Sequence, residues 1–329
     1  MVDSKIRVFV YETTSADPVC VDAALVSQGR SIRNAMLADL ALLDDVAVTC
    51  AIADPAQGGL PPGVHASCRP RQRAPQDYLR DEALRHDLAW VVAPETGGLL
   101  AGLRRVVADR RWLGCSSAAI DVAASKHATL QCLRAAGIAT PDGIGGAPSS
   151  SDGDAWIVKP DDGCGATEVR RHVGLASALA DRDERRRHHQ RAIVERWVDG
   201  EPLSITLLCS AGRAEVLSLN RQRIQVGPDG RLAFDGVVIG PVPGGRQEAL
   251  AALANRILGA LPGLAGIVGV DLVWHPLRGP VAIEINPRLT CAYVGLSAML
   301  GRNLAGEVLA QHAGAWPMMP FPGRAASAG

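Results

Sequence analysis

Residues 267–274 read IVGVDLVW and residues 281–288 read VAIEINPR, with HPLRGP at 275–280 between them. In both stretches apolar side chains recur at every second position, which is the pattern of a β-strand with one buried face. The segment between them holds two prolines and a glycine, which are typical of a turn. The sequence therefore predicts an antiparallel hairpin.

The register of this hairpin places polar side chains opposite one another. The expected pairs are Asp271 with Glu284, Gly269 with Asn286, and Trp274 with Val281. Two carboxylates so opposed have Cβ atoms about 4.5–5.5 Å apart and destabilise the hairpin unless their charge is compensated. A divalent cation held by Asp271, Glu284 and the Asn286 amide would compensate it, and Mg²⁺ prefers such oxygen ligands. Gly269 is expected to leave open space there for a phosphate. The alternative is a pair of exposed carboxylates on an edge hairpin.

A glycine-rich loop follows an upstream strand. Residues 155–160 form a strand that carries Lys159, the loop 161–166 reads DDGCGA, and a second short strand is expected at 167–171. This is not a Walker A loop, which runs into a helix. A glycine hairpin can still cover a triphosphate with backbone N–H groups while Lys159 supplies a point charge. The alternative is an ordinary β-turn.

Residues 193–201, IVERWVDGE, predict a buried strand that leaves through an Asp-Gly turn. Such a segment can offer backbone N–H and C=O groups to the edge of an adenine, with Trp197 or Val198 against its face. Glu201 is then placed to accept hydrogen bonds from ribose hydroxyls. The alternative is a plain hairpin.

The rest of the chain divides into two parts with different secondary-structure patterns. Strand and helix patterns alternate in the first 115 residues, at 6–11, 23–43, 46–52, 88–93 and 99–109, which predicts a parallel sheet of the α/β class. No GxGxxG follows the first strand, and 55–75 is expected to be a surface loop. From residue 142 onward, short strands and glycine turns predict an α+β region of mainly antiparallel pairs. Two further helices are expected at 125–137, with Ser125 as its N-cap, and at 249–261.

Composition narrows the classes of partner. The chain has 34 basic and 34 acidic residues and few aromatic ones, which argues against nucleic acid and membrane surfaces. The arginine- and histidine-rich run 181–191 is interpreted as an exposed helix face of mixed charge. The eight cysteines include no CxxC pair and no leader precedes the first strand, so reduced thiols and a cytoplasmic location are expected.

Taken in order, these motifs resemble the ATP-grasp superfamily of carboxylate-amine ligases over roughly residues 115–312. The resemblance implies an ATP-grasp fold preceded by a Rossmann-like parallel α/β domain. It divides the chain into an N-terminal (pre-ATP-grasp) domain at 1–115, a central lid subdomain at 116–191, a C-terminal subdomain with the Mg–ATP site at 192–313, and a disordered tail at 314–329. A homodimer through the N-terminal domain is also expected.

The resemblance also implies a role for each motif residue. Lys126 and Lys159 would contact the ATP phosphates, and Gly163, Cys164, Gly165 and Ala166 would form the mobile lid. Glu195, Arg196, Trp197 and Val198 would form the adenine hinge, with Glu201 on the ribose. Asp271, Glu284 and Asn286 would hold Mg²⁺, or Mn²⁺ in its place. Arg288 would sit over the transferred phosphate, and Lys159, Glu284 and Arg288 are the candidate catalytic residues.

A narrower resemblance rests on Gln28-Gly29-Arg30, Ala93-Pro94-Glu95 and the stretches 218–224 and 286–296. These sequence motifs resemble those of the tyramine-glutamate ligase group of methanofuran-type cofactor biosynthesis. They imply an ADP-forming enzyme that joins a glutamate carboxylate to an amine such as tyramine or tyrosine through an acyl-phosphate. The candidate substrate residues are Arg221, Gln222, Arg223 and Tyr293.

Three other functions remain open at this point. One is a dipeptide or amino-acid ligase with other substrates, although D-alanine-D-alanine ligases place an arginine where this chain has Gly269. Another is a nucleotide-binding regulatory protein without turnover. A third is a phosphotransferase, which would stop at a stable phosphate ester. Phosphate release that depends on an added amine separates the ligase from the last two.

Overall fold

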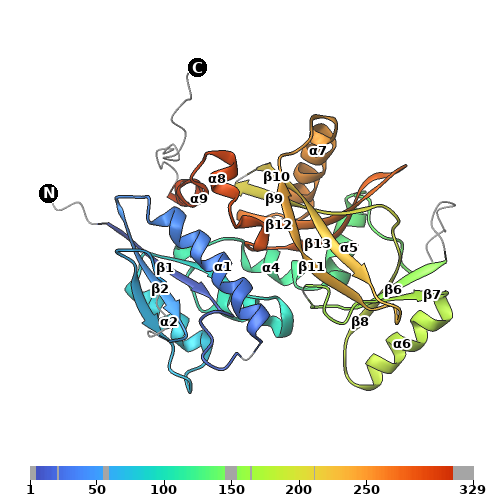
Figure 1. Ribbon diagram of the computed structural model, residues 1–329, viewed down its shortest axis with the longest axis horizontal. Coiled ribbons are helices and arrows are strands. Elements are labelled where there is room, and N and C mark those ends of the chain that lie inside the picture. The colour runs from blue at the N-terminus through green and yellow to red at the C-terminus, as the bar shows by residue number, and fades with distance from the viewer. Residues whose placement is uncertain are drawn as a thin grey trace.

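The computed structural model describes residues 5–20, 22–54, 59–144, 154–163, 165–210 and 212–313. Within these residues the strands form three sheets, ordered β3-β2-β1-β4-β5, β7-β6-β8 and β11-β10-β9-β12-β13. Figure 1 shows the first sheet with its helices at one side of the molecule and the other two sheets at the opposite side. Cys164 and residues 314–329, where a lid position and a disordered tail were expected, lie outside the described residues.

The first sheet is parallel, as the alternating pattern predicts. Its strands are β1 (Ile6–Glu12), β2 (Val46–Ile52), β3 (His65–Cys68), β4 (Leu88–Val92) and β5 (Trp112–Leu113). Its helical segments are α1 (Ala23–Leu40), α2 (Pro75–Arg85), η2 (Thr96–Gly98), α3 (Leu99–Arg105) and η3 (Asp109–Arg111). The expectation of a loop over 55–75 is wrong at its end, because β3 adds a short edge strand beside β2.

Two helices join this sheet to the rest of the chain, α4 (Ser117–Ala123) and α5 (Lys126–Ala135). Ser125 caps α5 as predicted, because its hydroxyl accepts a hydrogen bond from the Ala128 N–H. Leu130 and Leu133 on the inner face of α5 are buried. The cap fixes where α5 begins, and therefore where Lys126, its first residue, stands.

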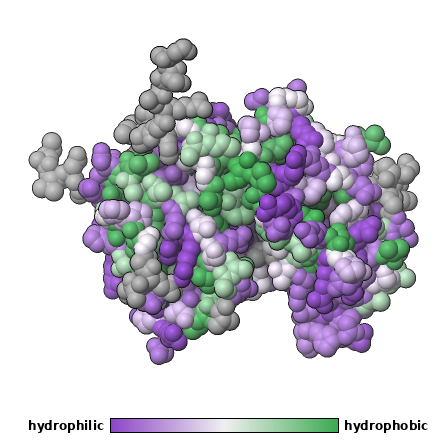
Figure 2. Space-filling view, in the orientation of Figure 1, coloured by the Kyte–Doolittle hydropathy of each residue, from purple (hydrophilic) through white to green (hydrophobic). Residues whose placement is uncertain are grey.

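The smallest sheet consists of β6 (Ala155–Pro160), β7 (Arg170–Val173) and β8 (Ala192–Arg196), all antiparallel. Helix α6 (Leu175–Arg187) covers one face, and Trp156, Val158, Ala178 and Val194 form the core between them. Charged residues of α6 pair along the helix, the exposed Arg187 with Glu184 and the largely buried Arg185 with Asp181. Figure 2 shows hydrophilic side chains over this part of the surface, which agrees with the mixed-charge face expected for 181–191.

The third sheet is antiparallel and carries the predicted hairpin of residues 267–288. Its strands are β9 (Glu201–Ser210), β10 (Arg213–Val226), β11 (Leu232–Gly240), β12 (Gly266–His275) and β13 (Gly279–Asn286). Helix α7 (Gly244–Ala260) covers it, with Leu250, Leu253 and Ile257 buried as the spacing predicts. None of the helices within the described ranges is long and apolar enough to cross a membrane.

The hairpin register is confirmed at its functional end and wrong near its turn. Asp271 lies opposite Glu284 and Gly269 opposite Asn286, but the register then shifts and Trp274 faces Pro280 rather than Val281. The shift arises because Ile283 forms a bulge, so that the two strands continue to His275 and Gly279. The turn is accordingly shorter than the six residues expected.

The C-terminal part returns to the first sheet. After β13 come η4 (Cys291–Tyr293), α8 (Leu296–Leu300) and α9 (Leu304–Ala313), and α9 packs against α1, β5 and β12. Figure 1 shows α8 and α9 between α1 of the N-terminal part and the strands of the third sheet. These helices therefore hold the parallel sheet against the antiparallel one.

Candidate active site

A cavity of about 1490 Å³ lies where the three sheets meet. Its walls include side chains from the N-terminal sheet, the small sheet and the hairpin, among them Glu12, Glu95, Lys126, Lys159, Asp271 and Arg288. The carboxyl ends of β1 and β4 open into it, and loops at that edge of a parallel sheet commonly bind ligands. Most of the residues singled out from the sequence therefore face one space.

The opposed carboxylates lie in this cavity as expected. Gln222 Nε2 donates to Asp271 Oδ1 at 2.8 Å, and Asn286 Nδ2 lies 3.4 Å from Asp271 Oδ2. Burial and the facing Glu284 carboxylate raise the pKa of Asp271 to about 7. Two carboxylates and an amide oxygen form a hard donor set with excess negative charge, and such a set fits a divalent cation. The residues present are thus compatible with Mg²⁺ or Mn²⁺.

The space expected at Gly269 is filled. A Cβ built on Gly269 would lie 2.8 Å from Thr290 Cγ2 and 3.5 Å from Asn286 Cβ. The chain after β13 folds back over β12, the strand that contains Gly269. Thr290 therefore occupies the position where a phosphate was expected. Glycine is required at 269 because of this close approach, and the expectation of an open phosphate subsite there is wrong.

The two predicted lysines are buried and paired with carboxylates. Lys159 Nζ lies 2.6 Å from Glu195 Oε1, and these side chains are only 4% and 5% exposed. Glu195 Oε2 has no hydrogen-bond partner within the described part of the chain. Lys126 Nζ lies 3.2 Å from Glu284 Oε2 and also donates to the Gly163 carbonyl. Lys126 therefore links the metal-type carboxylates to the glycine loop.

The glycine loop is held at its base. The Asp161 carboxylate accepts hydrogen bonds from Ser125 Oγ at 2.9 Å and from the His127 N–H at 2.9 Å, which ties the loop to the start of α5. Beyond Gly163 the backbone is left-handed at Gly165, Ala166 and Glu168, with φ of 65°, 60° and 57°. Non-glycine residues rarely adopt this conformation, and such strain is concentrated at functional sites.

The predicted hinge residues adjoin the cavity, but Glu201 is engaged elsewhere. Glu195, Arg196, Trp197 and Val198 all line the cavity. Glu201 forms ion pairs with Arg221 at 3.0 Å and with Arg246 at 2.8 Å. Burial raises the pKa of Glu201, but the hydrogen bonds from Arg246 and Arg221 outweigh it and lower the pKa overall. Its carboxylate is therefore ionised and already has two partners.

The four predicted substrate residues lie in three different environments. Gln222 lines the cavity, whereas Arg221 and Arg223 point to solvent, where they pair with Glu201 and Asp235. Tyr293 is only 1% exposed, and its hydroxyl donates to Asp39 Oδ2 at 2.5 Å. The assignment of Tyr293 to a substrate pocket is therefore wrong, because its ring is part of the core that α8 and α1 share.

Sequence reasoning gave no role to two acidic residues that the fold brings to the cavity. Glu12 ends β1, and its carboxylate accepts from the Thr14 N–H at 3.1 Å and the Ser15 N–H at 2.6 Å. Glu95 follows β4 and binds Arg288. Both stand at the carboxyl ends of parallel strands, and that position is the signal that would have identified them.

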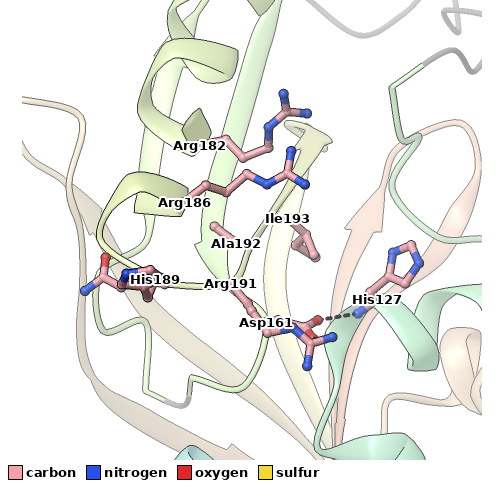
Figure 3. Close-up of a pocket in the computed structure, with 9 residues that line it drawn as sticks. His127, Asp161, Arg182, Arg186, His189, Arg191, Ala192 and Ile193 are labelled. Atoms are coloured by element: carbon pink, nitrogen blue, oxygen red, sulfur yellow. Dashed lines mark hydrogen bonds and ion pairs between the residues drawn. The ribbon is translucent and has the colours of Figure 1, made fainter. Parts of the chain in front are cut away.

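A second cavity, of about 500 Å³, lies beside the base of the glycine loop. Figure 3 shows Arg182 and Arg186 extending from α6, with Arg191 near Asp161. Asp161 is engaged by the start of α5, and Arg182 pairs with Asp183 at 2.8 Å. This hollow is arginine-rich and open to solvent, and it shares Asp161 and Arg191 with the large cavity.

The chain matches two family models. Residues 123–292 match one described as an ATP-grasp domain, and residues 46–120 match one described as a pre ATP-grasp 3 domain. These matches cover the small sheet, the third sheet and most of the parallel sheet.

Two curated relatives are tyramine–L-glutamate ligases. That of Methanocaldococcus jannaschii is 30% identical over 212 residues, which is 64% of this chain and 58% of the relative. That of Methanocaldococcus fervens is 29% identical over 222 residues, which is 67% of this chain and 64% of the relative. The alignments thus span less than two thirds of the length of these relatives.

Solved structures agree on the fold. A putative ATP-grasp superfamily protein from Archaeoglobus fulgidus is 21% identical, with a TM-score of 0.68 over 95% of this chain and 89% of that chain. An L-amino acid ligase from Bacillus licheniformis is 16% identical, with a TM-score of 0.62 over 94% of this chain and 74% of that one. With the ATP-grasp domain matching more than half of the sequence, this chain belongs to the ATP-grasp family.

Proposed function

We propose that the protein is an ATP-dependent, ADP-forming ligase that joins the carboxylate of glutamate to an amine such as tyramine or tyrosine. The observation that carries the proposal is the large cavity, in which two facing carboxylates, two buried lysines and an arginine converge. The names of the curated relatives support glutamate and tyramine as the substrates.

The chemistry accounts for this set of charges. A carboxylate is a poor electrophile because its charge repels a nucleophile and oxide is a poor leaving group. Transfer of the γ-phosphoryl group of ATP to the carboxylate makes an acyl-phosphate, from which an amine can expel phosphate. Catalysis of this kind depends on positioning and on neutralising the phosphate charge. No covalent nucleophile is needed, so neither Cys164 nor Cys291 is given a catalytic role.

In this proposal the nucleotide lies between the small sheet and the hairpin. Lys126 and Lys159 bind phosphate oxygens, and the backbone N–H groups around Gly163 to Ala166 cover them. Residues 195–198 hold the adenine edge. Asp271, Glu284 and Asn286 would hold Mg²⁺ or Mn²⁺, which when bound neutralises charge on the transferred phosphate.

The remaining groups act on the reacting centre. Arg288 binds the transferred phosphate and the acyl-phosphate that follows. The loop over the cavity excludes water, which would otherwise hydrolyse that intermediate. The edge of the parallel sheet, with Glu12 and Glu95, forms the wall opposite the hairpin, and the carboxylate and amine substrates bind there. A homodimer, a cytoplasmic location and the absence of nucleic-acid and membrane partners stay predictions from the sequence.

A product assay tests the function. The pure protein is incubated with ATP, Mg²⁺, glutamate and a panel of amines that includes tyramine, tyrosine and other amino acids, and products are identified by mass. We expect an amide of glutamate and phosphate release that depends on the amine. 4-Ethylphenol, which keeps the tyramine skeleton without the amine, serves as the matched control and should release no phosphate above background.

Each other outcome points to a different function. An amide formed only between amino acids other than glutamate and tyrosine would indicate a dipeptide ligase with other substrates. A stable phosphate ester without amide would indicate a phosphotransferase. Nucleotide binding without any product across the panel would contradict the proposed ligase and favour a regulatory nucleotide-binding protein.

A further inference from the structure

The N-terminal domain contributes a carboxylate that clamps the cavity arginine. Arg288 Nε donates to Glu95 Oε1 at 2.9 Å, and Arg288 Nη2 donates to Glu95 Oε2 at 2.8 Å. The two residues are 193 positions apart, and their side chains are only 13% and 6% exposed. This is the two-pronged pairing of guanidinium and carboxylate, which fixes the plane of the guanidinium as well as its position.

The clamp stands at the reacting end of the cavity. Arg288 comes two residues after Asn286 on the segment that leaves β13, and Glu95 comes three residues after the end of β4. Both line the large cavity. An arginine side chain has many rotamers, and holding it in one of them before substrate arrives removes an ordering cost from the reaction.

Stability alone does not account for such a pair. Removing two charges from water is costly, and apolar residues of similar size often stabilise a fold as well as a buried ion pair does. A buried pair that faces a ligand cavity, with one partner from each domain, is better explained by the geometry that it imposes.

We propose that Glu95 is a positioning residue that holds the Arg288 guanidinium over the transferred phosphate. This rests on the proposed function, which places a phosphoryl group at Arg288. Glu95 has both carboxylate oxygens engaged by Arg288, and the proposal gives it no contact with the reacting atoms or the metal. It acts through the arginine, and it makes the N-terminal domain part of the catalytic apparatus.

The same short segment also contacts the glycine loop. The Gly97 N–H donates to Asp162 Oδ2 at 2.9 Å, and Asp162 directly precedes Gly163. Gly97 and Gly98 both have left-handed backbones, with φ of 63° and 68°, which glycine adopts without strain. The sharp turn lets residues 95–97 reach Arg288 with a side chain and the loop with a backbone N–H. The position of the arginine is thereby linked to that of the loop.

Substitutions at Glu95 test the proposal. Glu95→Gln keeps the size of the side chain but replaces one acceptor oxygen with a donor, so it breaks the two-pronged pairing. We expect kcat for amide formation to fall about 10-fold to 10²-fold, the scale of a misplaced reacting group, while KM and the Kd for Mg–ATP change less than about twofold. Glu95→Asp keeps both oxygens and should recover part of the lost kcat.

The chain offers a matched control. Arg302 Nε and Nη2 bind the two oxygens of Glu307 in the same two-pronged way, and Glu307 is similarly buried but outside the large cavity. Glu307→Gln should lower the melting temperature and leave kcat within about twofold of wild type, because it loses the same kind of pair outside the site while Arg302 keeps Glu215 as a second partner.

The outcomes separate this inference from the function on which it rests. A wild-type protein that makes amide while Glu95→Gln keeps full kcat would overturn the role of Glu95 alone. Equal losses of kcat in Glu95→Gln and Glu307→Gln would also overturn it, since both would then reflect stability. A wild-type protein that makes no amide with any amine would overturn the proposed function, and the positioning role with it.

Discussion

At the scale of single residues, the site depends on two carboxylates that are unfavourable for the free hairpin. Asp271 and Glu284 lie opposite one another, and the raised pKa of Asp271 reports the cost of burying its charge next to a second one. Lys126, 3.2 Å from Glu284, compensates part of that charge. A pair maintained against this cost is best explained by a ligand of opposite charge.

Replacing Glu284 with glutamine tests this explanation. Glu284→Gln keeps the shape of the side chain but removes one charged metal-type oxygen, so we expect amide formation to fall at least ~10²-fold, the scale for losing one key electrostatic group. Glu248→Gln, at an exposed position on α7, is the control and should keep the wild-type rate. Steady-state rates at saturating ATP decide the matter, and a fully active Glu284→Gln enzyme would show that Glu284 is not a ligand.

A second substitution tests whether Tyr293 belongs to the core or to the substrate pocket. Tyr293 and Ser297 both donate to the buried Asp39 carboxylate, each at 2.5 Å. Tyr293→Phe removes one of these donors, and we expect the free energy of unfolding to fall by about 1–3 kcal/mol, the cost of a less satisfied buried acceptor. KM for both substrates should stay unchanged. Urea unfolding and steady-state kinetics measure the two effects, and an altered KM at wild-type stability would return Tyr293 to the pocket.

Side-chain pairs within one hairpin could be predicted from the sequence, whereas pairs between residues far apart in the sequence could not. The opposition of Asp271 and Glu284 follows from strand periodicity and one turn, so the sequence indicated it. The pair Glu95–Arg288 joins residues from two domains, and no local pattern records which loops meet after folding. For the same reason Tyr293, which follows a functional motif, was assigned to the pocket although it packs in the core.

At the scale of elements, the glycine loop is the part whose conformation the function uses most directly. Gly165 has a φ of 65°, and no neighbour lies within 4 Å of a Cβ built on it. A β-branched residue there is strained by about 1–2 kcal/mol without any steric clash. The strain should displace the loop from the position in which it excludes water from an acyl-phosphate.

Gly165→Val should therefore raise the ratio of ATP hydrolysed to amide formed. Gly212 offers the matched control, because its φ is 77° and a Cβ there also meets nothing within 4 Å, but it lies between β9 and β10, outside the large cavity. Gly212→Val carries comparable strain and should leave the ratio at the wild-type value. Parallel assays of ADP and amide give both ratios. If both variants stay coupled, the loop is not the water-excluding lid.

Elements with strong periodicity were predicted well, and weakly patterned ones were missed. Strand β2 and the capped helix α5 have clear apolar spacing or a clear N-cap. Strand β3, with the sequence HASC, is short and largely exposed at the edge of its sheet, so it has no alternating pattern to detect. The hairpin bulge at Ile283 could not be predicted from the pattern. The regular register pairs Leu272 with Ile283 and the observed one pairs it with Ala282, and both pairs are apolar.

At the scale of the whole molecule, the C-terminal helices complete a fold that the motifs describe only in part. The resemblance predicted an ATP-grasp fold that follows an N-terminal parallel domain in the sequence, and the two family matches confirm this order. It did not indicate that α9 would pack back on α1 and β5. That packing holds the wall with Glu12 and Glu95 against the hairpin, so the cavity depends on contacts far from its own residues.

Arg302 is a central charge in this packing. It pairs with Glu215 of β10 at 2.6 Å and with Glu307 of α9 at 2.6 Å, so it joins the third sheet to the last helix. The hydrogen bond from Arg302 lowers the pKa of Glu215 below its ordinary value of 4.5, although burial opposes the shift. A carboxyl group whose pKa is lower when folded stabilises the fold above its unfolded pKa and loses that effect as pH falls through its folded pKa.

Arg302→Met should consequently destabilise the protein more at neutral than at acidic pH. At pH 7 we expect a loss of about 1–2 kcal/mol in the free energy of unfolding, a modest value because Arg302 and Glu215 are about one third exposed. At pH 3.5, below the ordinary pKa of 4.5, the unfolded chain takes up a proton at Glu215 that the folded chain resists, so the difference from wild type should shrink. Arg105→Met, which breaks an exposed pair with Asp121, is the control and should cost less than about 1 kcal/mol at pH 7. Urea unfolding of the three proteins at both pH values measures this. An Arg302→Met deficit that is equal at pH 7 and pH 3.5 would mean that Arg302 stabilises the junction by packing its stem and not through its charge.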